Sequence, residues 1–260
     1  MTIQKKSKDE IEQMRQAGRI VYQVLEHLRS LVKPGVSTGM LGRAADEKIS
    51  ELGGKALFRG VPNPYAGYPF PAAICASIDD EVVHGIPSDS RILNEGQIIS
   101  IDCGVRYGRY CGDATITVAV GEISDSVRRL MTVTQEVLDI AIQMIRPGVR
   151  WSQIAAKMQA HVELNGYSVV KDFVGHGIGV EMHEDPKIPN FVSRELLRND
   201  ILLEAGMVLA VEPMVNMGSS AVRYGKDGWV VCTTDHQPSV HCEHTIAVTE
   251  DGSDVLTDGR

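Results

Sequence analysis

The sequence predicts an α+β fold built from two pseudosymmetric halves, about residues 1–121 and 122–260, within one domain spanning 1–260. Three observations predict it. Each half opens with amphipathic helical patterns, each continues into β-branched runs next to acidic residues, and short motifs recur in the same order in both halves. A chain of 260 residues, 43% of them hydrophobic, is long enough to bury a substantial core.

The internal repeat consists of four short matches. They pair Pro34-Gly35-Val36 with Pro147-Gly148-Val149, His84-Gly85-Ile86 with His176-Gly177-Ile178, residues 93–102 with residues 203–212, and residues 113–118 with residues 243–248. Each match is weak alone, but all four keep their order, so chance is the poorer explanation. In the last two pairs an acid stands at the end or the start of an apolar strand pattern.

The first half begins with two predicted helices. The motif Ser7-Lys8-Asp9-Glu10 has capping-box spacing, and apolar residues then recur at helical intervals to about Val32. Pro34-Gly35 ends this helix, and a second helical pattern follows as far as Gly53-Gly54. Residues 59–73, rich in proline, glycine and aromatic residues, predict an irregular surface loop whose rings either pack or line an apolar pocket.

Residues 93–120 predict a hairpin that brings two acids together. Two alternating β-branched runs flank Tyr107-Gly108, which suits a two-residue turn. With the turn centred there, Asp102 lies directly opposite Asp113, with Cβ atoms ~5 Å apart. A turn shifted by one residue would put the two acids on opposite faces. Since opposed like charges destabilise a sheet, the hairpin alone predicts either a bound cation or two solvated surface acids.

Composition narrows the class of protein. The formal net charge of −8 argues against direct nucleic-acid binding, and the cluster Lys5, Lys6 and Lys8 is expected to be solvated and without a function. No stretch reaches the length of a membrane-spanning helix and the N-terminus lacks a signal-peptide core, so we expect a cytoplasmic protein without a membrane partner. Five cysteines without a Cys-x-x-Cys pair predict reduced thiols.

Symmetric packing of the two halves would gather acidic residues from both at one seam, together with two histidines: Asp102, Asp113, Glu212, Glu243, His84 and His176. Four clustered carboxylates repel one another unless cations neutralise them. Carboxylates and an imidazole suit Mn²⁺, Fe²⁺, Co²⁺ or Zn²⁺, and the set is large enough for two divalent ions. Such a pair activates water, polarises a carbonyl and binds a free amine, which is the equipment for hydrolysing a peptide bond at an N-terminus.

The motifs around these donors carry a family resemblance. Asp102 and Asp113 are followed along the chain by Gly175-His176-Gly177-Ile178-Gly179, His183-Glu184-x-Pro186, Glu212-Pro213-Met214 and Glu243-His244-Thr245. Over nearly its whole length the chain resembles the type I methionine aminopeptidases. The resemblance implies the pita-bread fold, a curved antiparallel sheet of two pseudosymmetric halves with outer helices. Serine-hydrolase elbow, His-Glu-x-x-His and P-loop motifs are absent from the sequence, which disfavours those mechanisms.

The resemblance also implies a role for each donor. Asp102 would bind one metal ion, His176 and Glu212 the other, and Asp113 and Glu243 would bridge both. Glu212 would in addition move a proton between the nucleophilic water and the leaving amine.

Two further histidines are implied to act on the substrate. His84 and His183 match family histidines that contact the substrate and stabilise the tetrahedral intermediate without binding metal. Elsewhere, His244 should point to the sheet face opposite Glu243, whereas His241 shares the face of Glu243 and no motif recommends it.

The resemblance defines the methionine pocket less sharply than the metal ligands. The resemblance implies four residues around the methionine side chain: Tyr65, Tyr68, Cys75 and Trp229. The chain departs from the family at Met182, where many members have Phe, and in the length from Tyr68 to Cys75. Cys75 and Trp229 are equally typical of an ordinary core.

The implied function is removal of the N-terminal methionine from nascent polypeptides with a small second residue. Two alternatives stay open, an Xaa-Pro aminopeptidase or dipeptidase of the same fold and a non-catalytic pita-bread protein that binds peptides. The first usually carries a large N-terminal domain, and the second is expected to lose metal ligands. The 28 residues between His183 and Glu212 favour type I over type II enzymes. We expect a monomer; the physiological metal and docking to the ribosome stay open.

Overall fold

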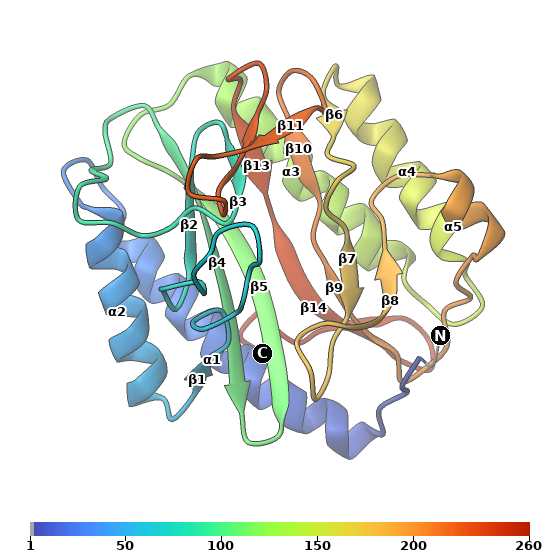
Figure 1. The fold of residues 1–260 in the computed structure, drawn as a ribbon. Coiled ribbons are helices and arrows are strands. Elements are labelled where there is room, and N and C mark those ends of the chain that lie inside the picture. Colours follow the sequence, from blue (N-terminus) through green and yellow to red (C-terminus); the bar gives the residue numbers. More distant parts are fainter. Residues whose placement is uncertain (1–2) are drawn as a thin grey trace.

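Figure 1 shows the computed structural model of the chain, which describes residues 3–260. In this described part nine strands form one curved antiparallel sheet, accompanied by two three-stranded sheets. The helices lie outside the sheet: α1 (Lys8–Leu31), α2 (Thr38–Glu51), α3 (Asp125–Met144), α4 (Trp151–Leu164) and α5 (Arg194–Arg198). This is the α+β architecture that the repeat predicts.

The large sheet has the spatial order β1-β4-β5-β14-β9-β7-β8, with β2 also paired to β4 and β15 to β14. Its strands are β1 (Lys55–Ala56), β2 (Cys75–Ile78), β4 (Ile98–Tyr107), β5 (Tyr110–Ala119), β7 (Gly175–Gly177), β8 (Glu184–Ile188), β9 (Val208–Val211), β14 (Glu243–Val248) and β15 (Ser253–Val255). One small sheet joins β6 (Ser168–Val169), β10 (Met214–Asn216) and β13 (Ser239–His241). The other joins β3 (Glu81–Val83), β11 (Val222–Tyr224) and β12 (Val231–Thr233).

Each half packs its own helices on its own strands. Buried Val21 of α1 shares a core with Ile101 of β4, and Leu130 of α3 and Trp151 of α4 share another with Leu209 of β9. Burying an apolar side chain of this size contributes ~1.5–3 kcal/mol. These cores hold α1 and α2 on the first half and α3 and α4 on the second.

The first helix begins where its sequence predicts. Ser7 Oγ accepts a hydrogen bond from the Glu10 backbone N–H (3.3 Å), and a Glu10 carboxylate oxygen accepts one from the Ser7 N–H (2.8 Å). This capping box satisfies two of the amide groups that every helix start leaves without a partner. Residues 59–73 form the irregular loop that was expected.

The β4–β5 hairpin forms, but its predicted register is wrong. The turn centres one residue later than predicted, with Gly108 at φ +57°, so that Asp102 lies opposite Thr115 and Asp113 lies opposite Gly104. Moving a two-residue turn by one position shifts every cross-strand pair by two residues, which keeps each side chain on its face. The two acids therefore stay on one face as diagonal neighbours, and the expectation that such a shift would separate them is also wrong.

The two halves meet where β5 pairs with β14. Thr115 of β5 lies opposite Glu243 of β14, and β14 continues into its pairing with β9. The order β4-β5-β14-β9 thus places equivalent strand pairs on either side of the seam. This confirms the duplicated architecture and brings the acid-bearing strands side by side.

The N-terminal lysines do not all behave as expected. Lys5 and Lys8 are exposed, but Lys6 is buried, with its ammonium 2.5 Å from a carboxylate oxygen of Glu184. The expectation of a solvated cluster fails because the segment before α1 packs against the chain near Gly206.

Two compositional predictions can be compared with the structure. All five cysteines are buried free thiols, as predicted. Within residues 3–260, every helix is too short or too polar to cross a lipid bilayer.

Candidate active site

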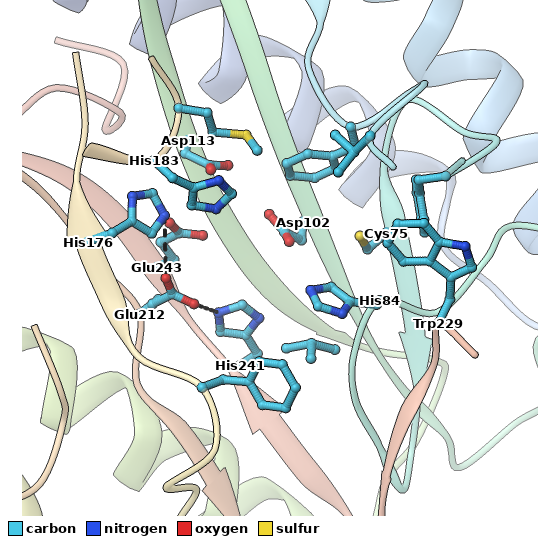
Figure 2. Close-up of a pocket in the computed structure, with 16 residues that line it drawn as sticks. Cys75, His84, Asp102, Asp113, His176, His183, Glu212, Trp229, His241 and Glu243 are labelled. Carbon is cyan, nitrogen blue, oxygen red and sulfur yellow. Dashed lines mark ion pairs between the residues drawn. The ribbon is translucent and has the colours of Figure 1, made fainter. Parts of the chain in front are cut away.

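Four acids and one histidine converge on a single cavity from strands of both halves (Figure 2). Asp102 comes from β4 and Asp113 from β5. Glu243 begins β14, Glu212 directly follows β9, and His176 lies in the middle of β7. The structure therefore brings together all five candidate donors that the sequence singled out. They meet because β5 of the first half pairs with β14 of the second half.

The donor atoms are close enough to share a small cation. Ligand atoms of Asp113, His176 and Glu243 all lie within 4.8 Å of one another, and His176 Nε2 lies 3.6 Å from Glu212 Oε1. His176 Nδ1 lies 2.9 Å from the carbonyl oxygen of Gly177. A carbonyl oxygen only accepts, so Nδ1 carries the proton and Nε2 presents its lone pair to the cavity.

Burial makes the acid cluster unfavourable without a cation. Loss of solvation raises the pKa of Asp102 to about 7 and holds those of Asp113, Glu212 and Glu243 well above their ordinary values, with the neighbouring carboxylates adding to the last three. One carboxylate oxygen each of Asp102 and Asp113 is buried without a hydrogen-bond partner among the described residues. Orphaned, anionic acceptors next to an imidazole lone pair fit divalent metal ions.

Neutral histidines border the acid cluster. His84 directly follows β3 and adopts φ +63°, a left-handed conformation that costs a non-glycine residue energy. Burial, with the neighbouring His183, lowers the pKa of His84 to about 4. The His183 ring, from the loop between β7 and β8, has its centroid 4.3 Å from that of His176. Both predicted substrate histidines therefore line the same cavity as the metal donors.

His241 is a site residue that the sequence did not single out. It is 3% exposed, and its Nε2 lies 3.7 Å from Glu212 Oε2, on the side away from His176 (Figure 2). Its Nε2 lacks a hydrogen-bond partner in the part of the chain that the structure describes. The available signal was its position two residues before Glu243 on an extended segment, which puts both side chains on one face.

An apolar pocket adjoins the acid cluster. Trp229 packs edge-on against Phe70, with ring centroids 5.1 Å apart, and Phe58 and Cys75 belong to the same buried cluster. Cys75 lies opposite Asp102 in the β2–β4 pairing, so the pocket begins directly beside the metal donors. Cys75 and Trp229 thus both line the cavity, and their role around a methionine side chain stays a prediction.

The two predicted tyrosines lie elsewhere. Tyr65 is 88% exposed and Tyr68 is 41% exposed, and the residues lining the cavity include neither. The Tyr68 hydroxyl instead donates to the carbonyl of Asp227. Phe58, which directly precedes the irregular loop, and Phe70 within it line the pocket instead. Met182, the departure noted in the sequence, also lines the pocket.

Comparison with known proteins agrees with this geometry. The sequence profile of Metallopeptidase family M24 matches residues 12–250. The chain is 45% identical over 252 residues to a methionine aminopeptidase of Clostridium acetobutylicum, which covers 97% of each chain. It is similar to the crystal structure of methionine aminopeptidase from Thermotoga maritima, with a TM-score of 0.92, 40% identity, and coverage of 98% of this chain and 99% of that one.

The structure of a dipeptidase shares the fold at lower similarity. Xaa-Pro dipeptidase from Bacillus anthracis aligns with a TM-score of 0.75 and 25% identity, covering 98% of this chain and 62% of the dipeptidase. The added length in that protein lies outside the shared fold.

The curved sheet of two halves and its buried donor cluster define a metal-dependent hydrolase with the pita-bread fold. The chain belongs to metallopeptidase family M24. Its cofactors are accordingly divalent metal ions, and the orphaned carboxylate oxygens and the exposed lone pair of His176 fit such ions.

Proposed function

We propose that this chain is a type I methionine aminopeptidase, which removes the N-terminal methionine from nascent proteins and peptides with a small second residue. The observation that carries the proposal is the convergence of five metal donors on a cavity whose other wall is apolar. Similarity to methionine aminopeptidases over nearly the full length of both chains supports it.

The proposed ligand set divides between two divalent ions. Asp102 would hold one ion, His176 and Glu212 would hold the other, and Asp113 and Glu243 would be ligands to both. Cobalt, manganese, iron and zinc all suit this mixed oxygen and nitrogen set.

When bound, the ions would supply a water of lowered pKa and polarise the scissile carbonyl. Glu212 would take up a proton from the nucleophilic water and return it to the leaving amine. His84 and His183, neutral because burial disfavours their charged forms, donate hydrogen bonds to the substrate carbonyl as it becomes tetrahedral.

The apolar pocket receives the methionine side chain. Phe70 and Trp229 offer ring edges and faces, which interact favourably with a thioether sulfur. Cys75 and Met182 complete a polarizable lining without charge. A bulky second residue would collide with the pocket wall, so a small one is preferred.

A panel of three peptides tests this function. Met-Ala-Ser, the same peptide with phenylalanine second, and an Xaa-Pro peptide are incubated with protein loaded in turn with Mn²⁺, Fe²⁺, Co²⁺ and Zn²⁺. We expect release of methionine from Met-Ala-Ser and little from the other two. Cleavage of Xaa-Pro alone would favour the proline-specific alternative, and no hydrolysis with any ion is the outcome that the binding-protein alternative predicts.

A variant of the proton carrier tests the mechanism. Glu212→Gln keeps the shape of the side chain but removes its basicity and one ligand charge. We expect weaker metal binding and loss of turnover of Met-Ala-Ser, and full activity would overturn the role of Glu212.

We further propose that the enzyme acts as a cytoplasmic monomer on chains emerging from the ribosome. The net charge of −8 disfavours direct binding to ribosomal RNA, so contact with the ribosome would be through the nascent chain. Light scattering of the purified protein and co-sedimentation with translating ribosomes test the two parts separately.

A further inference from the structure

The loop between β7 and β8 carries His183 and Met182 into the active site. Its start is held by backbone bonds, from Ile178 N–H to the Val208 carbonyl (3.1 Å) and from Cys111 N–H to the Gly179 carbonyl (2.8 Å). His183 itself is partly exposed at the cavity mouth. The far end of the loop enters β8 at Glu184, which lies opposite Gly177 of β7, so the course of the loop between these anchored ends depends on the contacts of its side chains and of Glu184.

Glu184, the next residue, holds that end through both of its carboxylate oxygens. Oε1 accepts a hydrogen bond from the Glu181 N–H at 3.1 Å, within the loop. Oε2 lies 2.5 Å from the Lys6 ammonium, and the two side chains are 11% and 5% exposed. One carboxylate thus ties the loop to a residue 178 positions earlier in the chain.

Lys6 is in turn fixed by its surroundings. Its backbone N–H donates to the Gly206 carbonyl at 2.7 Å, and its ammonium also donates to the Gln4 carbonyl at 3.2 Å. A Cβ added at Gly206 would meet the Lys6 carbonyl oxygen at 2.8 Å. A Cβ added at Gly179 would come within 2.4 Å of Lys6 Cε and 2.6 Å of Glu184 Oε1. The loop and the segment before α1 therefore pack tightly around the Lys6 side chain.

A buried ion pair is an inefficient way to stabilise a fold. Two charges lose their hydration, and apolar residues of similar volume are often as stabilising or more so, whereas a pair with further hydrogen bonds defines one geometry. Here the geometry defined is that of the residue next to His183.

We propose that Lys6 is a positioning residue: through Glu184 it fixes the loop of residues 178–183 so that His183 faces the metal donors and the substrate. The segment before α1 is on this account part of the active-site assembly. The kinetic consequence rests on the proposed function, whereas the order of the loop does not.

Four variants test the proposal, each made in the full chain. Lys6→Met removes the charge and keeps the length, Glu184→Gln keeps the shape, the double variant Lys6→Met/Glu184→Gln measures their coupling, and Lys6→Arg restores the charge. Lys5→Met is the matched control, because Lys5 forms a solvent-exposed pair with Glu204 in the same segment.

Hydrogen exchange of the peptide covering residues 178–184 is the first measurement. We expect faster exchange in Lys6→Met and Glu184→Gln, with α3 and α4 unchanged and Lys5→Met like the wild type. Exchange in this loop that is unchanged in both single variants would overturn the proposal. If Lys6→Met fails to fold, Glu184→Gln alone decides.

Kinetics with Met-Ala-Ser is the second measurement. We expect kcat to fall about ten- to a hundred-fold with a smaller change in KM, because misplacing a group that acts in the transition state by ~1 Å has this effect. The double variant should lose no more than the single ones, metal affinity should stay unchanged, and Lys6→Arg should recover part of the rate. An additive double variant would overturn the coupling. If the wild type does not cleave Met-Ala-Ser, the proposed function fails and the exchange result still decides the role of Lys6.

Discussion

Thr115 on β5 lies opposite Glu243 on β14, and its hydroxyl donates a 2.9 Å hydrogen bond to Glu243 Oε2. The same threonine lies opposite Asp102 on its other side. A buried, 2% exposed hydroxyl thus stands between two proposed metal ligands that come from different halves of the chain. Hydrogen bonds of this kind orient a ligand and fix which oxygen faces the metal.

We expect Thr115→Val to weaken metal binding. The substitution keeps the shape and removes the donor to Glu243, and loss of such a supporting bond typically costs about ten- to a hundred-fold in affinity. Calorimetric titration with Mn²⁺ measures it. Thr132→Val is the control, because that hydroxyl bonds to the Arg128 carbonyl on exposed α3. Equal affinity in Thr115→Val and the wild type would contradict the prediction.

We expect the neutral ring of His241 to orient Glu212. Burial, with the neighbouring His84, lowers the pKa of His241 to about 3, so the ring acts near neutral pH through its N–H group and not through charge. His241→Phe removes this donor, and His241→Gln keeps one. Because Nε2 lies 3.7 Å from Glu212 Oε2 without a formed hydrogen bond, turnover of Met-Ala-Ser should fall in His241→Phe by less than the roughly ten-fold that loss of a full hydrogen bond to a charged group causes. Glutamine should recover most of it, and equal impairment of both variants would point to packing instead.

Removal of metal should make stability depend on pH. The pKa of Asp102 is raised from 3.8 in the unfolded chain to about 7 in the fold, and those of Asp113, Glu212 and Glu243 are also raised well above their ordinary values. Between these values the folded state binds more protons than the unfolded state, so the free energy of unfolding falls as pH rises.

Thermal unfolding of chelated and metal-loaded protein from pH 5 to pH 8 measures this dependence. We expect Tm of the chelated protein to fall across the range and Tm of the loaded protein to fall less. If the protein freed of metal by a chelator became more stable with rising pH, the pKa values of the clustered acids would not be raised in the fold.

Phe70 should matter for methionine recognition, and Tyr65 should not. Phe70 is 2% exposed in contact with Trp229, whereas Tyr65 is 88% exposed. Removing apolar contact worth ~1.5–3 kcal/mol from the pocket should lower kcat/KM of Phe70→Ala for Met-Ala-Ser about ten- to a hundred-fold. The kcat/KM of Tyr65→Ala should stay close to that of the wild type. A larger loss in Tyr65→Ala than in Phe70→Ala would show that Tyr65 contacts the methionine side chain.

Local patterns identified the elements and the donors. The capping box at Ser7 predicts the start of α1 because its two hydrogen bonds involve residues three apart. The ordered repeat predicts that β4-β5 and β9-β14 are equivalent, and with it that Asp102, Asp113, Glu212 and Glu243 meet at one seam. Periodicity and order along the chain carry this information directly.

Other features depended on turn and loop conformations that periodicity does not describe. The hairpin register follows from where Gly108 can take positive φ, and a one-residue error in the turn moves the partner of Asp102 to Thr115. The exposure of Tyr65 and the burial of Phe70 depend on how an irregular loop folds back on Trp229, and no periodicity describes such a loop.

The sequence by itself determined the duplicated α+β architecture and predicted the five candidate donors and the kind of ion they suit, because strand alternation, motif order and ligand chemistry can be read along the chain. Only the tertiary structure decided the register at Asp102, the approach of His241 to Glu212 and the burial of Lys6 against Glu184. The register depends on which residues form the turn at Gly108, and the other two features depend on the free energy of packing distant segments, 178 residues apart for Lys6 and Glu184.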